Sequence, residues 1–120
     1  MRIYREAETP WRCGHWNGSP LEILVSPVTM SIPQSEAYHY HEFHEYYVVL
    51  RGRATLCVEG SDVPLEAGMV MMVQPGEKHR LTWIDPDNGV QWIVVKERST
   101  PDGKVIVPEP GALNGTPPGA

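Results

Sequence analysis

The chain has 120 residues, which is enough for one hydrophobic core and predicts a single domain. Ten Lys and Arg residues against fifteen Asp and Glu residues give a formal net charge of -5, and the absence of a basic run argues against nucleic acid as a partner. No apolar stretch is long enough to span a bilayer and the N-terminus lacks a secretory leader pattern, so the sequence predicts a cytoplasmic protein with no membrane partner.

Short strands separated by turns are predicted over most of the length. Twelve prolines and eleven glycines interrupt apolar runs rich in Val, Ile, Tyr, Trp and Thr, a pattern typical of an all-β sandwich or barrel. The expected strands, in chain order, are Leu21 to Val25, Val28 to Ile32, Tyr46 to Leu50, Ala54 to Val58, Val70 to Val73, Leu81 to Ile84 and Val90 to Lys96.

The two ends of the chain differ from this pattern. Residues 1–20 are broken by proline and glycine and are expected to form an arm or strand that packs on the barrel. A Pro/Gly-rich segment of low complexity begins at Pro108 and predicts a flexible tail. Turn signals, including Arg51-Gly52, separate the strands between these ends. The expected organisation is an arm over residues 1–20, one barrel over residues 21–107 and a tail over residues 108–120.

Metal-binding side chains gather in the segment that follows the second expected strand. His39 and His41 are two residues apart, so on a strand they point to the same face. Glu45 follows a turn-like segment, and an antiparallel hairpin can bring its carboxylate back toward both imidazoles. His79 follows a Pro-Gly turn and offers a third imidazole from another hairpin. The spacing predicts an inward-facing metal site with these four residues as ligands.

These residues resemble the two motifs of the cupin superfamily. The first motif is Gly-x5-His-x-His-x3-4-Glu-x6-Gly, and this chain reads His39-x-His41-x3-Glu45-x6-Gly52. The second is Gly-x5-Pro-x-Gly-x2-His-x3-Asn, and this chain reads Gly68-x5-Gln74-Pro75-Gly76-x2-His79-x3-Trp83. The departures, Pro33, Gln74 and Trp83, fall at turn and wall positions rather than at ligands. The resemblance covers residues 21–96 and implies a single-domain double-stranded β-helix, or jelly-roll barrel, with the metal in its interior.

The predicted ligand set limits the metal and the chemistry. Three imidazoles and one carboxylate suit Fe(II), Mn(II), Ni(II), Cu(II) or Zn(II). An octahedral ion with four protein ligands keeps two positions for water, O2 or a bidentate substrate. The expected function is a metal-dependent enzyme acting on a small organic molecule, with an Fe(II)-type oxygenase preferred. A lyase or isomerase of a small acid or sugar derivative, and a non-catalytic ligand-binding or sensor cupin, stay open as alternatives.

Other residues are assigned by the face of the strand on which they fall. Tyr47 shares the face of Glu45 and is a candidate catalytic acid or base, with a plain core tyrosine as the alternative. Trp83 shares the face of His79 and is expected to line the pocket or to fill the core. His44 is expected in the hairpin turn, away from the metal.

The remaining predictions concern methionine and tryptophan residues. Met69, Met71 and Met72 are expected to fill irregular core volume. Cupins of this size are commonly dimers, so a homodimer is expected, with Trp11 and Trp16 of the N-terminal segment as part of its interface.

Overall fold

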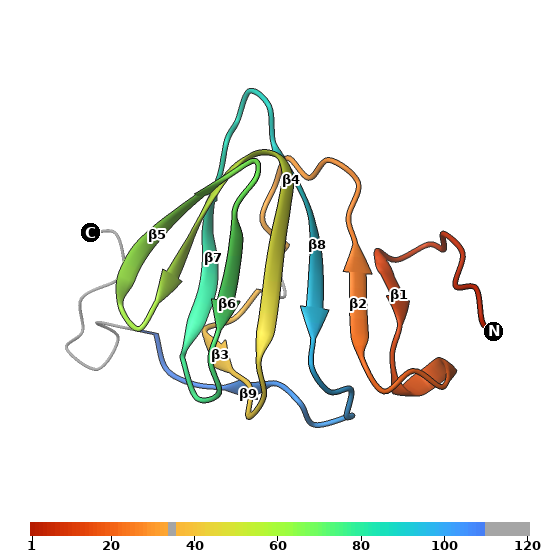
Figure 1. Ribbon diagram of the computed structural model, residues 1–120. Helices are drawn as coiled ribbons and strands as arrows, with labels where there is room; N and C mark the ends of the chain where they lie inside the picture. Colours follow the sequence, from red (N-terminus) through yellow and green to blue (C-terminus); the bar gives the residue numbers. More distant parts are fainter. Residues whose placement is uncertain (34–35, 110–120) are drawn as a thin grey trace.

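The computed structural model describes residues 1–33 and 36–109. Within these residues the chain forms a nine-stranded curled sheet with one 3-10 turn and no α-helix (Figure 1). The elements are β1 (Trp11–Cys13), η1 (His15–Asn17), β2 (Glu22–Val25), β3 (His39–Tyr40), β4 (Glu45–Val58), β5 (Ser61–Glu66), β6 (Val70–Val73), β7 (His79–Ile84), β8 (Val90–Lys96) and β9 (Val105–Ile106). No helix among the described residues is long and apolar enough to cross a membrane. The predicted all-β fold is confirmed.

Strand β4 joins the two halves of the curled sheet. Up to Gly52 it pairs antiparallel with β6 and β8, and from Arg53 onward it pairs with β5 and β7. A bulge between Val49 and Arg51 and a φ of 73° at Gly52 bend the strand between these parts. The predicted turn at Arg51-Gly52 is therefore wrong, because the glycine forms a corner inside one continuous strand.

The core lies inside the curl. Alternate residues of β4 point inward, and Tyr47, Val49 and Leu56 are among its most buried side chains. They pack against inward residues of β7 and β8, such as Leu81 and Trp92. Because hydrophobic residues alternate along these strands, their inward side chains form one core that both halves of the sheet share.

Several strand predictions differ from the structure. Residues 28–32 form no strand, and only an isolated bridge joins Thr29 to Val90. Pro27 and Pro33 flank this segment and remove backbone donors that a strand would need. Strand β5 was not predicted because it contains Pro64, which is tolerated because β5 is an edge strand paired only with β4.

The N-terminal segment adds an edge to the sheet. In β1, Trp11 pairs with Leu24 of β2, and β2 in turn pairs with β8. Of the tail predicted from Pro108, residues 110–120 lie outside the described residues.

The outward surface of the β2–β8–β4–β6 half carries Arg51 and Gln91 at its end next to Gly52 and consists elsewhere of apolar side chains. In the register of these strands, they are Ile23, Val25, Tyr46, Val48, Leu50, Val70, Met72, Ile93 and Val95. We call the surface of these apolar side chains the apolar outer face. The prediction that the methionines fill the core holds for Met71, which packs against it, but is wrong for Met69 and Met72. Met72 points outward because it alternates with the buried Val73, and Met69 precedes β6 in the turn.

Candidate metal centre

Strand pairing brings the four predicted ligands together. His39 of β3 lies opposite His79 of β7, Glu45 is the first residue of β4, and His41 lies in the connection between β3 and β4. All four side chains are buried, and one ligand atom from each lies within 4.8 Å of the ligand atoms of the other three. The structure thus places the predicted residues in one cluster.

Backbone carbonyl groups orient the three imidazoles. The Nδ1 atom of His39 lies next to the carbonyl oxygen of Ala37, that of His41 next to the carbonyl oxygen of Gly103, and that of His79 next to the carbonyl oxygen of Glu77. A carbonyl oxygen can only accept a hydrogen bond, so each Nδ1 carries the hydrogen and donates it. The Nε2 atoms are then left to present lone pairs to the centre of the cluster. This is the tautomer that metal-binding histidines commonly adopt when a neighbouring acceptor fixes the ring.

Glu45 lies at the centre of the polar contacts. Its Oε1 atom is 2.9 Å from Nε2 of His79 and 3.5 Å from Nε2 of His41. Nε2 of His41 is buried and has no hydrogen-bond partner among the described residues. An unpartnered buried nitrogen is costly unless another group satisfies it. Together with the donor set of three imidazoles and one carboxylate, this nitrogen fits a bound divalent cation.

Burial and proximity shift the pKa values of the cluster. Burial lowers the pKa of His39 to about 3, which keeps this imidazole neutral. Burial also acts to lower the pKa of His79, but the adjacent Glu45 carboxylate outweighs it and the net shift is upward. For Glu45, burial acts to raise the pKa, but the adjacent imidazoles of His41 and His79 outweigh it and hold the pKa well below its usual range. The carboxylate is therefore ionised, as a ligand requires.

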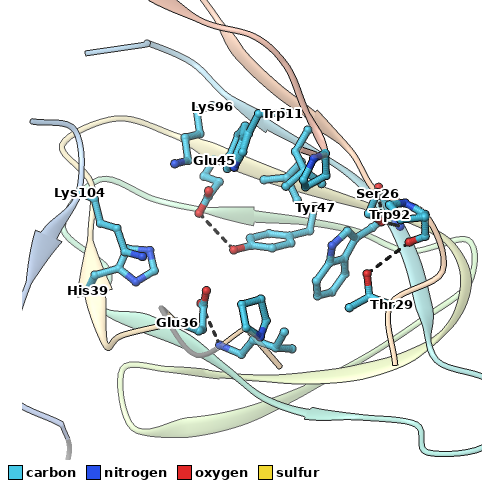
Figure 2. A pocket seen from close by; sticks show the side chains of 16 residues that line it. Trp11, Ser26, Thr29, Glu36, His39, Glu45, Tyr47, Trp92, Lys96 and Lys104 are labelled. Atoms are coloured by element: carbon cyan, nitrogen blue, oxygen red, sulfur yellow. Dashed lines mark hydrogen bonds between the residues drawn. The ribbon is translucent and has the colours of Figure 1, made fainter. Parts of the chain in front are cut away.

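A cavity of about 280 Å³ opens beside the cluster (Figure 2). His39 and Glu45 form part of its wall, so the cluster is accessible to a small molecule from this side. The Tyr47 ring meets the Trp92 ring edge-on at a centroid distance of 5.2 Å and closes the inner wall. The Tyr47 hydroxyl lies 3.4 Å from Oε1 of Glu45, which orients it toward the cluster.

Glu36 is a cavity residue that sequence reasoning missed. Its Oε1 atom accepts a hydrogen bond of 3.3 Å from the backbone N–H of Leu81, and its carboxylate faces the cavity (Figure 2). The residue lies in a loop, where strand alternation gives no information about side-chain direction. Its position three residues before His39 is the one signal that could have drawn attention to it.

Two other predicted positions lie away from the cavity. Trp83 is 41% exposed, so the expectation of a pocket wall or a core residue is wrong. A bulge between Thr55 and Leu56 turns the Trp83 side chain outward, where the Arg53 guanidinium lies 5.8 Å from its ring centroid. His44 lies outside the cluster as expected, with its Nδ1 atom 2.8 Å from Oε2 of Glu97.

Comparison with known families identifies the domain. Residues 28–96, more than half of the chain, match the Cupin_2 family, described as the cupin domain. No curated protein sequence matches the chain.

Solved structures share the fold at low sequence identity. A cupin protein from Bacteroides fragilis has a TM-score of 0.61 and 14% identity, and the match covers 84% of this chain and 89% of that one. An RmlC-like cupin with a double-stranded β-helix fold from Methanocaldococcus jannaschii has a TM-score of 0.61 and 17% identity, over 82% of this chain and 91% of that one.

Hydroxypropylphosphonic acid epoxidase from S. wedmorenis is also similar, with a TM-score of 0.52 and 20% identity. That match covers 64% of this chain and 43% of the epoxidase chain, and a structure of FeII HppE matches to a comparable extent. At these identities the structures establish the double-stranded β-helix fold and nothing finer. Since the domain match spans more than half of the sequence and solved cupins share its fold, this chain belongs to the cupin family.

Proposed function

We propose that the protein is a divalent-metal-dependent enzyme acting on a small organic molecule, and that an Fe(II)-type oxygenase is the first candidate. The observation that carries the proposal is the convergence of three Nε2 atoms and the Glu45 carboxylate in a buried cluster that opens on a cavity. Similarity to the epoxidase and to FeII HppE supports the iron version of the proposal at the level of the fold.

His39, His41, Glu45 and His79 would hold the ion. When bound, the ion would act as a Lewis acid toward a substrate oxygen and, if it is iron, as a redox centre. The carbonyl groups behind the three imidazoles fix the rings, so the protein is organised for the ion before binding. Trp92 and Tyr47 wall the inner side of the cavity and exclude water from it.

A metal-dependent lyase or isomerase is the second candidate, and Glu36 is the observation that favours it. Such a reaction moves a proton between substrate positions and needs an acid and a base in the cavity. The Glu36 carboxylate and the Tyr47 hydroxyl both face the cavity from different sides (Figure 2). Glu36 can accept a proton, whereas burial raises the pKa of Tyr47 well above its usual value and keeps this hydroxyl a donor.

Metal content tests the site assignment. The variant His39→Ala/His79→Ala, purified without chelator, is expected to lose nearly all of its bound transition metal because half of the ligand set is gone. His44→Ala is the matched control, since it removes a histidine of the same segment that lies outside the cluster. Elemental analysis of all three proteins, with circular dichroism to confirm folding, gives the answer. Equal metal content in the double variant and the wild type would refute the site.

Oxygen dependence separates the two reaction classes. An O2-uptake screen of the metal-loaded protein with small acids, diketones and sugar derivatives is expected to reveal substrate-dependent consumption of O2. Turnover that proceeds equally well without O2 would refute the oxygenase and support the lyase or isomerase. Binding without any turnover would support a ligand-binding or sensor cupin.

We also propose a cytoplasmic homodimer. The two unbridged cysteines, Cys13 and Cys57, support a reducing compartment. The interface expected from the sequence involved Trp11 and Trp16. Trp11 lines the cavity and Trp16 is 52% exposed, and the apolar outer face is the better support for a dimer.

A further inference from the structure

The cavity wall includes residues that lie outside the matched family domain. Pro10 and Trp11 come from the N-terminal arm and Lys104 from the segment before β9, whereas the family match spans residues 28–96. The family match therefore does not cover this part of the cavity wall. Figure 2 shows Trp11 and Lys104 among the side chains that line the cavity.

One side of the cavity is apolar and aromatic. The lining side chains on this side are Trp11, Leu24, Tyr47, Leu81, Trp92 and Val94. Trp11 is held in place from two directions, because β1 pairs with β2 and the Lys96 ammonium lies 4.6 Å from its ring centroid. A preformed apolar wall of this kind favours a ligand with a hydrocarbon or ring-shaped body.

Two lysines, Lys96 and Lys104, line the cavity together with the carboxylates of Glu36 and Glu45. Lys96 is already neutralised, since its Nζ atom lies 3.3 Å from Oε2 of Glu22. Lys104 also lines the cavity, and no carboxylate among the described residues lies within ion-pair distance of it. Its ammonium group lies beside His39 (Figure 2). Lys104 is thus the cation of the cavity wall that a ligand can pair with.

Volume limits the size of the ligand. At about 280 Å³, the cavity falls just below the range of roughly 300–1,000 Å³ that is usual for drug-sized ligands. A molecule of roughly ten non-hydrogen atoms therefore fits, with one end at the cluster and the other against Trp92.

We propose that the cavity selects a small organic acid with an apolar, ring-sized body, and that Lys104 and Trp11 determine this selection. Lys104 pairs with the anionic group, and Trp11 packs on the body. The proposal rests on the proposed function only for the location of the site, because both residues act on the ligand whether or not a metal is bound.

Calorimetric titration of the full chain tests the selection with matched probes. Benzoate and 3-phenylpropanoate carry both a ring and a charge, benzyl alcohol and 3-phenylpropan-1-ol carry only the ring, and acetate carries only the charge. The two ring acids are expected to bind at least about tenfold more tightly than their alcohols and than acetate. Ring acids that bind no better than the alcohols, or that fail to bind at about 10 mM, would overturn the proposal.

Two substitutions test whether Lys104 and Trp11 determine which ligands bind. Lys104→Met is expected to weaken binding of the ring acids by about three- to tenfold and to leave the alcohols unchanged, because it removes one charge near the ligand. Lys78→Met is the matched control, since Lys78 does not line the cavity. Trp11→Ala is expected to weaken the ring acids and alcohols but not acetate. If Trp11→Ala does not fold, the Lys104 and Lys78 variants still decide the charge requirement.

Metal titration of the same samples distinguishes the two proposals. Ring acids that fail to bind a protein with normal metal affinity would refute the ligand proposal alone. Ring acids that bind a protein without metal affinity would refute the proposed function alone. Equal loss of ring-acid affinity in Lys104→Met and Lys78→Met would show that overall charge, not Lys104, attracts the ligand.

Discussion

At the scale of single residues, Asp85 is a buried carboxylate whose hydrogen bonds lie outside the metal centre. Its Oδ1 atom accepts the backbone N–H of Asp87 at 2.9 Å, and its Oδ2 atom accepts two N–H groups of Arg53 at 3.0 and 3.2 Å. The Asp87 N–H is the main cause that lowers the pKa of Asp85 from its usual value of 3.8, against the effect of burial, and Arg53 lowers it further.

Asp85→Asn is therefore expected to lower the melting temperature at neutral pH. A carboxylate whose pKa is lower in the folded than in the unfolded state stabilises the fold fully above the unfolded pKa. That contribution is lost as the pH falls through the folded pKa, so the difference between wild type and variant is expected to narrow below about pH 4. Thermal melts of both proteins from neutral to acidic pH measure this difference in melting temperature. Asp62→Asn, at an exposed position, is the control, and a pH-independent difference would contradict the prediction.

The candidate metal ligands and the other cavity residues differ in how far the sequence could predict them. His39 and His41 could be paired because strand residues two apart share a face, and Glu45 because a hairpin returns to the same place. Glu36 and Lys104 could not be placed, because loop residues follow no such alternation. Trp83 was misplaced because one bulge reverses the faces of all residues beyond it, and the sequence around it contains no signal for that bulge.

At the scale of elements, the corner of β4 decides whether both halves of the sheet can share one strand. A Cβ atom on Gly52 would lie 1.9 Å from the carbonyl oxygen of Gly89, which is a backbone atom and cannot move aside. The φ of 73° at this position is also unfavourable for any other residue. Sequence reasoning identified this glycine from the motif but assigned it to a turn, because glycine is common both in turns and at bends within strands.

Gly52→Ala is expected to cost about 3 kcal/mol or more of the free energy of unfolding, from the clash and the backbone strain together. Gly60→Ala is the matched control, since Gly60 has a φ of 80° but no described atom within 4 Å of its would-be Cβ. It is expected to cost only about 1 kcal/mol, from the strain alone. Urea unfolding measures the loss of unfolding free energy in both variants. Equal losses would show that the close approach to Gly89 contributes nothing.

At the scale of the whole molecule, the two halves of the sheet present different outer surfaces. The outward side chains of the β4–β5–β7 half include Arg53, Asp62, Glu66 and Arg80, as expected for a sheet that faces water. Apart from Arg51 at its end, the outer surface of the β2–β8–β4–β6 half is uncharged, and Val70 within the apolar outer face is 64% exposed. Exposed apolar patches of this kind are typical of protein interfaces.

A second copy of the chain suits this surface. Two uncharged sheets can pack face to face about 10 Å apart without opposing like charges, and a two-fold axis makes one patch its own complement. Four strands about 4.8 Å apart and about five residues long give the face a plan area of roughly 300 Å². A standard interface buries roughly 800 Å² on each partner, so the face supplies the centre and neighbouring exposed residues such as Met69 extend it.

Val70→Lys tests this interface, because it places a charge at the most exposed position of the apolar outer face while leaving the core intact. The wild type is expected to sediment as a dimer, and the variant as a folded monomer, because a lysine opposite an apolar sheet would lose its hydration. Asp62→Lys is the matched control, since it adds the same side chain to the outer surface of the other half and should stay dimeric. Analytical ultracentrifugation reads out the mass of each protein. A monomeric wild type, or a variant that stays dimeric, would exclude this face as the dimer interface.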